Sequence, residues 1–311
     1  MKIPNETFQK TAAWMKRNAR PLETARWEYF FENGSAGKVI HYLSAFQNED
    51  GGFGHGLEPD FWLPHSSAIA TWSAGQILME IGASSQEKIV QSLLSYLANS
   101  YDLEAGLWKT VHPKTNDYPH APWWHWEEGV QENWMYNPSV ELAAFLVHWL
   151  PQENENSRIG WEVLEYAVNH LMNSQTMDSH EINNFQQLVK IMKPYEQSFN
   201  RKLNYSFANV AEKVMLLAAD CIEKDVSEWS IGYKPLPLDF IDGPEHPLCE
   251  KFSKLVEHNL QFYVDQLSDD GIWDISWNWG SYPEAYAVAR QQWKGILAVD
   301  RYKLLQSFGC L

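Results

Sequence analysis

Carboxylates and aromatic side chains occur together in three segments of the chain, near residues 58–62, 123–128 and 273–279. A carboxyl group can act as a general acid when an apolar wall or a second carboxylate favours its neutral form. Two carboxylates that flank a bond can hydrolyse a glycoside. The candidate catalytic residues are therefore Asp274, Asp60, Glu58, Glu127 and Glu128. Asp274 is the strongest of them, because Trp273, Ile275 and Trp277 surround it in the sequence.

Tryptophan and histidine are concentrated in the same parts of the chain. The segments 47–65, 101–137 and 268–282 hold nine of the 16 Trp and five of the 11 His. Aromatic faces stabilise cations and stack on apolar faces of ligands, which predicts an aromatic-walled pocket. The alternative is that these aromatics only pack the loops together and plug the centre of the fold. The candidate substrate-binding residues are His55, Trp62, His65, Trp123, Trp124, His125, Trp126, Trp134, Trp277 and Trp279.

Neither a metal site nor a bound cofactor is indicated by the sequence. His120 and His125 are five residues apart, which is not the i, i+4 spacing of a zinc helix. No Walker loop, dinucleotide fingerprint or Gly-x-Ser-x-Gly motif occurs. We expect no metal and no cofactor, with magnesium entering only if the substrate is a diphosphate.

Composition limits the partners. Lys and Arg number 24 against 40 Asp and Glu, a formal net charge of −16. This excess argues against binding nucleic acid or an anionic membrane surface. The sequence shows no signal peptide and no apolar stretch that could span a bilayer, so we expect a cytoplasmic protein whose ligand is a small hydrophobic molecule or a saccharide.

Apolar residues recur with helical periodicity along most of the chain. No segment shows several alternating β-branched strands with hairpin turns, so the fold is predicted to be all-α. One segment, 227–246, lacks periodicity and is expected to be a long loop. The predicted helices are 8–19, 22–32, 35–46, 66–81, 86–99, 139–150, 158–173, 180–192, 206–222, 247–267 and 283–306.

Three helix ends share a pattern in which a Tyr is followed by an acidic residue, a Gly and an aromatic. The copies end at Phe53, Trp108 and Trp273. After each, an irregular loop leads to a helix that Pro or a neighbouring residue opens. Such a repeat predicts a closed ring of about six helical hairpins, with the three loops at one rim. We see no linker and expect a single domain over residues 1–311.

The segment Gln47–Gly54 resembles the Gly-aromatic repeat of squalene and terpenoid cyclases, and the β subunits of protein prenyltransferases carry a similar repeat. Ser268–Trp273 looks like another copy. The resemblance implies an α/α toroid. The catalytic motifs of these families are missing: no Asp-x-Asp-Asp run occurs, Asp269-Asp270 lacks the magnesium spacing, and Asp220-Cys221 are adjacent rather than spaced for zinc.

Three functions remain open from the sequence. The first is a terpenoid-cyclase-like enzyme that acts on an isoprenoid substrate by acid-initiated chemistry in an aromatic-lined central cavity. The second is a carbohydrate-active hydrolase or lyase on an (α/α)6 barrel that uses paired carboxylates. The third is a non-catalytic binding module. Cavity walls that are polar rather than apolar would favour the second over the first.

Overall fold

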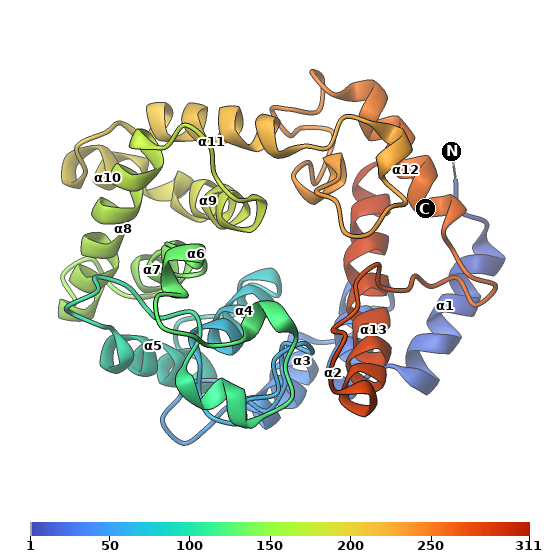
Figure 1. The fold of residues 1–311 in the computed structure, drawn as a ribbon, viewed down its shortest axis with the longest axis horizontal. Coiled ribbons are helices and arrows are strands. Elements are labelled where there is room, and N and C mark those ends of the chain that lie inside the picture. Colours follow the sequence, from blue (N-terminus) through green and yellow to red (C-terminus); the bar gives the residue numbers. More distant parts are fainter. Residues whose placement is uncertain (1) are drawn as a thin grey trace. The chain divides into compact units, whose positions relative to one another are not determined.

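The computed structural model describes residues 2–311, and the fold in this range is all-helical (Figure 1). No strand occurs in it, only isolated β-bridges. The all-α prediction is therefore confirmed. The chain divides into two compact units, one formed by Met1–Leu43 with Ile222–Leu311 and the other by Ser44–Cys221.

The Ser44–Cys221 unit is built around α7 (Ser139–Trp149), whose residues are almost all buried. α7 packs against α8 (Glu155–Asn173), α9 (Ser179–Met192), α4 (Ala68–Glu80) and α5 (Lys88–Ser100). α11 (Phe207–Cys221) covers α8 and α9. Helices α4, α7 and α9 thus form one row, and α5, α8 and α11 pack along one side of it (Figure 1).

Two short helices complete this unit, α6 (Gln131–Trp134) and α10 (Glu196–Lys202). Close packing of α4 on α7 depends on Gly75, where a Cβ would come within 2.2 Å of the Phe145 ring. The small residue therefore lets the two helices approach each other.

The other unit contains α1 (Asn5–Asn18), α2 (Pro21–Phe31), α3 (Ala36–Leu43), α12 (Ser253–Asp265) and α13 (Pro283–Ser307). Its core is an aromatic cluster in which the rings of Trp27 and Tyr302 lie 5.2 Å apart. Phe8 and Phe31 pack on the same two rings. The Tyr302 hydroxyl is 2.7 Å from the Thr11 hydroxyl, which joins α13 to α1.

The predicted helices all occur, with ends displaced by a few residues. Ser67 caps α4, because its hydroxyl accepts a hydrogen bond from the Ala70 N–H at 3.2 Å. The segment 227–246 is irregular apart from short 3₁₀ turns, as predicted. Helices α6 and α10 were not predicted, because each is too short to show an apolar period.

The three Gly-aromatic segments form similar turns, two in the Ser44–Cys221 unit and one in the other unit. In residues 48–52, the Asn48 N–H donates to the Gly52 carbonyl at 2.8 Å and the Gly51 N–H donates to the Asn48 carbonyl at 2.9 Å. The 268–272 turn makes the same two bonds, and the 102–107 turn is one residue longer. Gly51, Gly106 and Gly271 all have positive φ, which a residue with a Cβ adopts only at a cost.

The aromatic residue after each turn is a core residue. Phe53, Trp108 and Trp273 are all buried. The Trp108 indole N–H donates to the Leu97 carbonyl at 2.9 Å, and that of Trp273 donates to the Tyr263 carbonyl at 2.7 Å. Each indole is thus fixed to the helix that precedes its turn. No helix among residues 2–311 is both long and apolar enough to cross a bilayer.

Candidate functional site

Two of the three predicted loops, 47–65 and 101–137, meet in the Ser44–Cys221 unit. The Trp62 N–H donates to the Pro119 carbonyl at 3.1 Å, and the Ala121 N–H donates to the Asp60 carbonyl at 2.9 Å. These bonds pair a stretch of one loop with a stretch of the other in antiparallel fashion. The third loop, 268–282, belongs to the other unit and is described below on its own.

A pocket of about 640 Å³ opens where the two loops meet at the first Gly turn. Its walls come from the turn itself, from the end of the 47–65 loop and from the 101–137 loop. We call it the Gly-turn pocket, and its lining residues are Asn48, Glu49, Asp50, Leu63, His65, Ser66, His112 and Lys114. Seven of these eight side chains are polar, so the walls suit a ligand with many hydrogen-bonding groups.

The carboxylate of Asp50 is held in a fixed position in this pocket. Its Oδ1 accepts the Gly52 N–H at 3.0 Å and the Ser66 hydroxyl at 2.6 Å. The Ser66 hydroxyl in turn accepts the Asn48 side-chain amide at 3.0 Å. Because Oδ1 carries both bonds, Oδ2 is the oxygen that remains for a ligand hydroxyl.

His112 contributes a hydrogen-bond donor to the same pocket. Its Nδ1 accepts the Lys114 backbone N–H at 3.1 Å, so in the neutral ring the proton sits on Nε2. Burial lowers the pKa of His112, and the positive charges of Lys114 and His65 lower it further. The neutral imidazole therefore presents Nε2–H as a donor near pH 7.

Three of the predicted Trp residues of these loops, Trp62, Trp124 and Trp134, contact other residues of the same loops. Trp124 is buried and stacks on Trp134 with ring centroids 4.6 Å apart, and Phe61 packs edge-on against Trp124. Trp62 is half-buried, with its indole N–H bonded to the Pro59 carbonyl at 2.7 Å. These side chains pack within the loop cluster, and none of them lines the Gly-turn pocket.

Among the three Trp residues of the run 123–126, only Trp123 is exposed. Trp123 is 38% exposed, and the half-buried Trp126 is held through its backbone by two 2.9 Å hydrogen bonds with the Asn116 side chain. His125 is exposed, and its Nδ1 lies 3.0 Å from Nε2 of the buried His120. Since His120 Nδ1 donates to the Tyr118 carbonyl at 2.6 Å, its Nε2 accepts the proton of His125.

The other two predicted His residues lie at the Gly turn. His65 lines the Gly-turn pocket, as predicted for a binding residue, and packs edge-on against Tyr118. His55 lies beside the pocket wall, because its Nε2 donates to the Asn48 side-chain oxygen at 2.8 Å.

The predicted carboxylates of the two loops lie outside this pocket. Glu58 and Asp60 are buried within the loop cluster, 8% and 2% exposed. Glu127 and Glu128 are exposed on the surface of the 101–137 loop. The structure therefore does not bring these four carboxylates to the walls of the Gly-turn pocket.

Asp274 lies in the other unit and is paired with two cations of α13. The Arg290 guanidinium donates to its carboxylate, with the Nε–Oδ1 distance at 2.8 Å, and Lys294 lies 3.2 Å away. Burial opposes the charged form, but the hydrogen bonds from Arg290 and Lys294 outweigh it, and the pKa of Asp274 is lowered. A lowered pKa suits a structural anion rather than a proton donor.

Trp277 and Trp279 of this loop also pack within their own unit. Trp277 lies edge-on to Trp293 with ring centroids 5.2 Å apart. Trp279 is buried and packs against Tyr286. Both aromatics therefore anchor the 268–282 loop to α13.

Of the eight residues that line the Gly-turn pocket, only His65 was predicted from the sequence. Among the other seven, the charged or titratable side chains are Glu49, Asp50, His112 and Lys114. Glu49 and Asp50 belong to the Gly-aromatic motif, which we interpreted only as evidence for the fold. The pair of acidic residues before Gly51 could have indicated a binding site as well. No signal marked His112 or Lys114, because their place in the pocket depends on how the two loops pair.

Glu141, which was not predicted from the sequence, is a buried carboxyl group in the first turn of α7 that is 2% exposed. Its Oε2 accepts the Trp72 indole N–H at 2.6 Å, and the Gln76 amide nitrogen lies 3.2 Å from both oxygens. Burial raises the pKa of Glu141 from 4.5 to about 7, and these two hydrogen bonds only partly offset the rise.

Comparison with known proteins adds no assignment: no family model, curated protein or solved structure matches the chain. Among residues 2–311, no group of three or more His, Cys, Asp and Glu side chains is arranged to hold a metal ion. The function must therefore be inferred from the pocket itself.

Proposed function

We propose that the chain is a carbohydrate-active protein that binds a saccharide in the Gly-turn pocket and cleaves a glycosidic bond there, by hydrolysis or by elimination. The polarity of the walls is the observation that carries this proposal. Seven of the eight lining residues are polar and only Leu63 is apolar. Saccharide hydroxyls both donate and accept, which matches carboxylate acceptors and the His112 and Lys114 donors.

The same walls give no support to the hypothesis of an isoprenoid substrate. A hydrocarbon substrate needs apolar walls, but none of the predicted Trp side chains lines this pocket. Trp62, Trp124 and Trp134 contact other residues of the loops instead. Lys114 is the only Lys or Arg that lines the pocket, so a diphosphate would meet one permanent cation beside two carboxylates.

The catalytic groups of this proposal are the carboxylates of Glu49 and Asp50. Glycoside hydrolysis uses one carboxyl group as acid and another as base or nucleophile. Both side chains line the pocket. The Nε2–H of His112 is a donor that can hold a substrate oxygen. Asp50, fixed by Gly52 and Ser66, is the better positioned of the two carboxylates.

The proposed scaffold is an α/α toroid with internal repeats. Two observations support it: the two rows of helices in the Ser44–Cys221 unit, and the matching hydrogen bonds of the 48–52 and 268–272 turns. A crystal structure with helical hairpins arranged in a closed ring would confirm it, and an open arrangement would refute it. The toroid, a single domain and a cytoplasmic location remain predictions.

The test is a panel of neutral, acidic and amino oligosaccharides, assayed for new reducing ends and for the double bond that elimination creates. Binding is measured in parallel by calorimetry, with Asp50→Asn as the main variant. Asparagine keeps the oxygen that accepts from Gly52 and Ser66 but loses the charge, so the turn should persist. We expect binding at least tenfold weaker, about 1.4 kcal/mol, since hydrogen bonds to charged groups exceed that value.

Two comparisons make the result specific. Glu104→Gln removes an exposed carboxylate from the 102–107 turn, outside the pocket, and should change neither binding nor turnover. Glu49→Gln should abolish turnover and leave binding measurable. Turnover that survives both Glu49→Gln and Asp50→Asn would reject these carboxylates, and binding of prenyl diphosphates in preference to saccharides would reject the proposed substrate class.

A further inference from the structure

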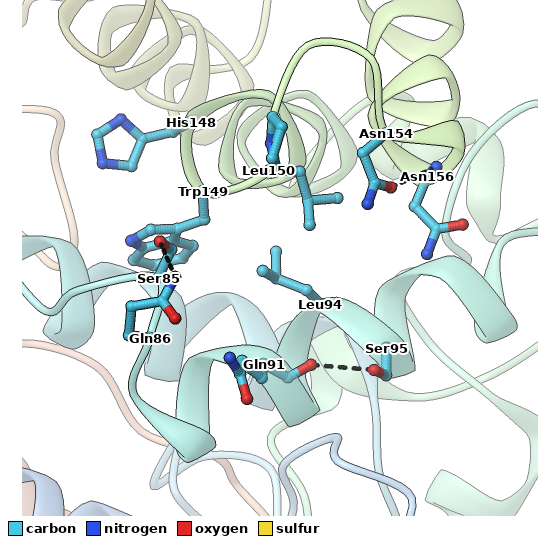
Figure 2. Close-up of a pocket in the computed structure, with 11 residues that line it drawn as sticks. Ser85, Gln86, Gln91, Leu94, Ser95, His148, Trp149, Leu150, Asn154 and Asn156 are labelled. Carbon is cyan, nitrogen blue, oxygen red and sulfur yellow. Dashed lines mark hydrogen bonds between the residues drawn. The ribbon is translucent and has the colours of Figure 1, made fainter.

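A second cavity, of about 550 Å³, lies between α5 and the connection from α7 to α8 (Figure 2). It shares no residue with the Gly-turn pocket. It also adjoins the last turn of α7, whereas the 101–137 loop leads into the first turn of that helix. The lining residues are Ser85, Gln86, Gln91, Leu94, Ser95, His148, Trp149, Leu150, Pro151, Asn154 and Asn156.

No Asp, Glu, Lys or Arg lines this cavity. Its one titratable side chain is His148. Burial lowers the pKa of His148, so the imidazole is neutral near pH 7. The Tyr195 hydroxyl contacts Nδ1 and the carbonyl of the same residue at 3.3 and 3.2 Å. The cavity is therefore uncharged and suits a ligand without charge.

The polar groups of the walls are amides and hydroxyls with hydrogen-bonding capacity to spare. Gln91 is exposed and Asn156 is half-buried. Neither side-chain amide makes a hydrogen bond to another described residue. Asn154 uses only its Oδ1, which accepts the Asn156 N–H at 2.9 Å. Each free amide can donate to one ligand hydroxyl and accept from another.

Apolar side chains form the middle of the cavity. Figure 2 shows Leu94 and Leu150 pointing toward each other, with Asn154 and Asn156 on one side of them and Trp149 on the other. Leu94 is 4% exposed and Trp149 is 5% exposed. Trp149 is held in place because its indole N–H donates to the Ala83 carbonyl at 3.1 Å. The C–H faces of a sugar ring are apolar and match such a surface.

We propose that this cavity is a binding site for a neutral saccharide of about two rings, held by the amides of Gln91, Asn154 and Asn156 over the Leu94–Leu150 pair. A peptide fits the cavity less well. Peptides are commonly bound by addition to a strand edge, by an apolar groove that holds a helix, or by an aromatic groove that holds a polyproline segment. The unit has no strand among its described residues, and amides line much of this cavity.

The proposal stands independently of the Gly-turn pocket. The probe is a panel of neutral disaccharides, titrated into the full chain by calorimetry. Gln91→Leu and Asn156→Leu keep the side-chain volume and remove the amide. We expect each to weaken binding about tenfold, as the loss of one or two hydrogen bonds predicts. Asn209→Leu changes an exposed amide of α11 outside the cavity and should leave the affinity unchanged.

The outcomes separate this site from the other one. Binding that Asp50→Asn leaves intact and Asn156→Leu weakens assigns the neutral saccharide to this cavity. Binding that is lost with Asp50→Asn and unaffected by Gln91→Leu and Asn156→Leu overturns the proposal, as does the absence of binding by any neutral disaccharide. Tighter binding of uncharged tetrapeptides than of disaccharides also overturns it. Circular dichroism of each variant checks that the helices persist.

Discussion

Replacing Glu141 with Gln should remove a specific pH dependence of folding. In the folded state the pKa of Glu141 is about 7, against 4.5 for an ordinary Glu. Between these values the folded chain holds a proton that the unfolded chain has released. The stability contributed by this proton is complete below pH 4.5 and is lost as the pH rises through 7. Each pKa unit is worth about 1.4 kcal/mol, so the loss is about 3 kcal/mol.

Gln keeps the size of the side chain and an oxygen that can accept the Trp72 indole N–H. Its amide nitrogen can donate to the Gln76 side-chain oxygen if that amide turns over. Because an amide does not titrate in this pH range, the variant should lack this part of the pH dependence. Relative to wild type, Glu141→Gln should gain about 3 kcal/mol between pH 4.5 and pH 8.

The assay is urea unfolding followed by tryptophan fluorescence at several values of pH between 4.5 and 8. Glu128→Gln is the matched control, because it removes an exposed carboxylate from the same unit. The pH dependence that Glu141→Gln removes and Glu128→Gln retains is the part that Glu141 contributes. A difference between Glu141→Gln and wild type that does not change with pH would show that Glu141 is ionised in the folded protein throughout this range, and would refute the reasoning.

The remaining predictions concern the turns and the ion pairs. Gly51→Ala should destabilise more than Gly82→Ala by chemical denaturation, because both have positive φ but only at Gly51 would a Cβ meet the Ser92 carbonyl, at 2.1 Å; equal losses would contradict this. Trp108→Phe should cost about 1–3 kcal/mol through its lost bond to Leu97, and Trp123→Phe almost nothing. Asp274→Asn should change stability by about 1 kcal/mol or less at low salt, since both side chains of the Arg290–Asp274 pair are exposed to solvent; a loss of several kcal/mol would contradict this.

Helical periodicity was enough to predict the all-α fold, because helices such as α5 have one apolar face. Ile89, Leu93 and Leu97 recur along α5 at helical spacing and are all buried. The ends of α4 also carry local signals, since Ser67 caps its start and Gly82, with positive φ, follows its end. These signals are local, so they can be read without knowing which helices are neighbours.

The site was less predictable because it depends on contacts between distant segments. His112 reaches the Gly turn only because the 101–137 loop pairs with the 47–65 loop through Asp60 and Trp62. Nothing at position 141 indicated that Glu141 would be enclosed by α4, since one Glu in the first turn of a helix is ordinarily a favourable surface residue. The Trp-rich loops predicted an aromatic-walled pocket, with internal packing as the alternative, and in the structure Trp124 packs against Trp134 and Phe61.

The most direct test of the saccharide proposal is the NMR signal of the His112 ring during a titration with oligosaccharides, assigned by its loss in His112→Gln. His112 lines the Gly-turn pocket, so a bound sugar must change the surroundings of its Nε2–H. We predict that the His112 and His65 signals shift with a saccharide and stay in place with a prenyl diphosphate. Signals that shift only with the prenyl diphosphate, or with neither ligand, would contradict the proposed function.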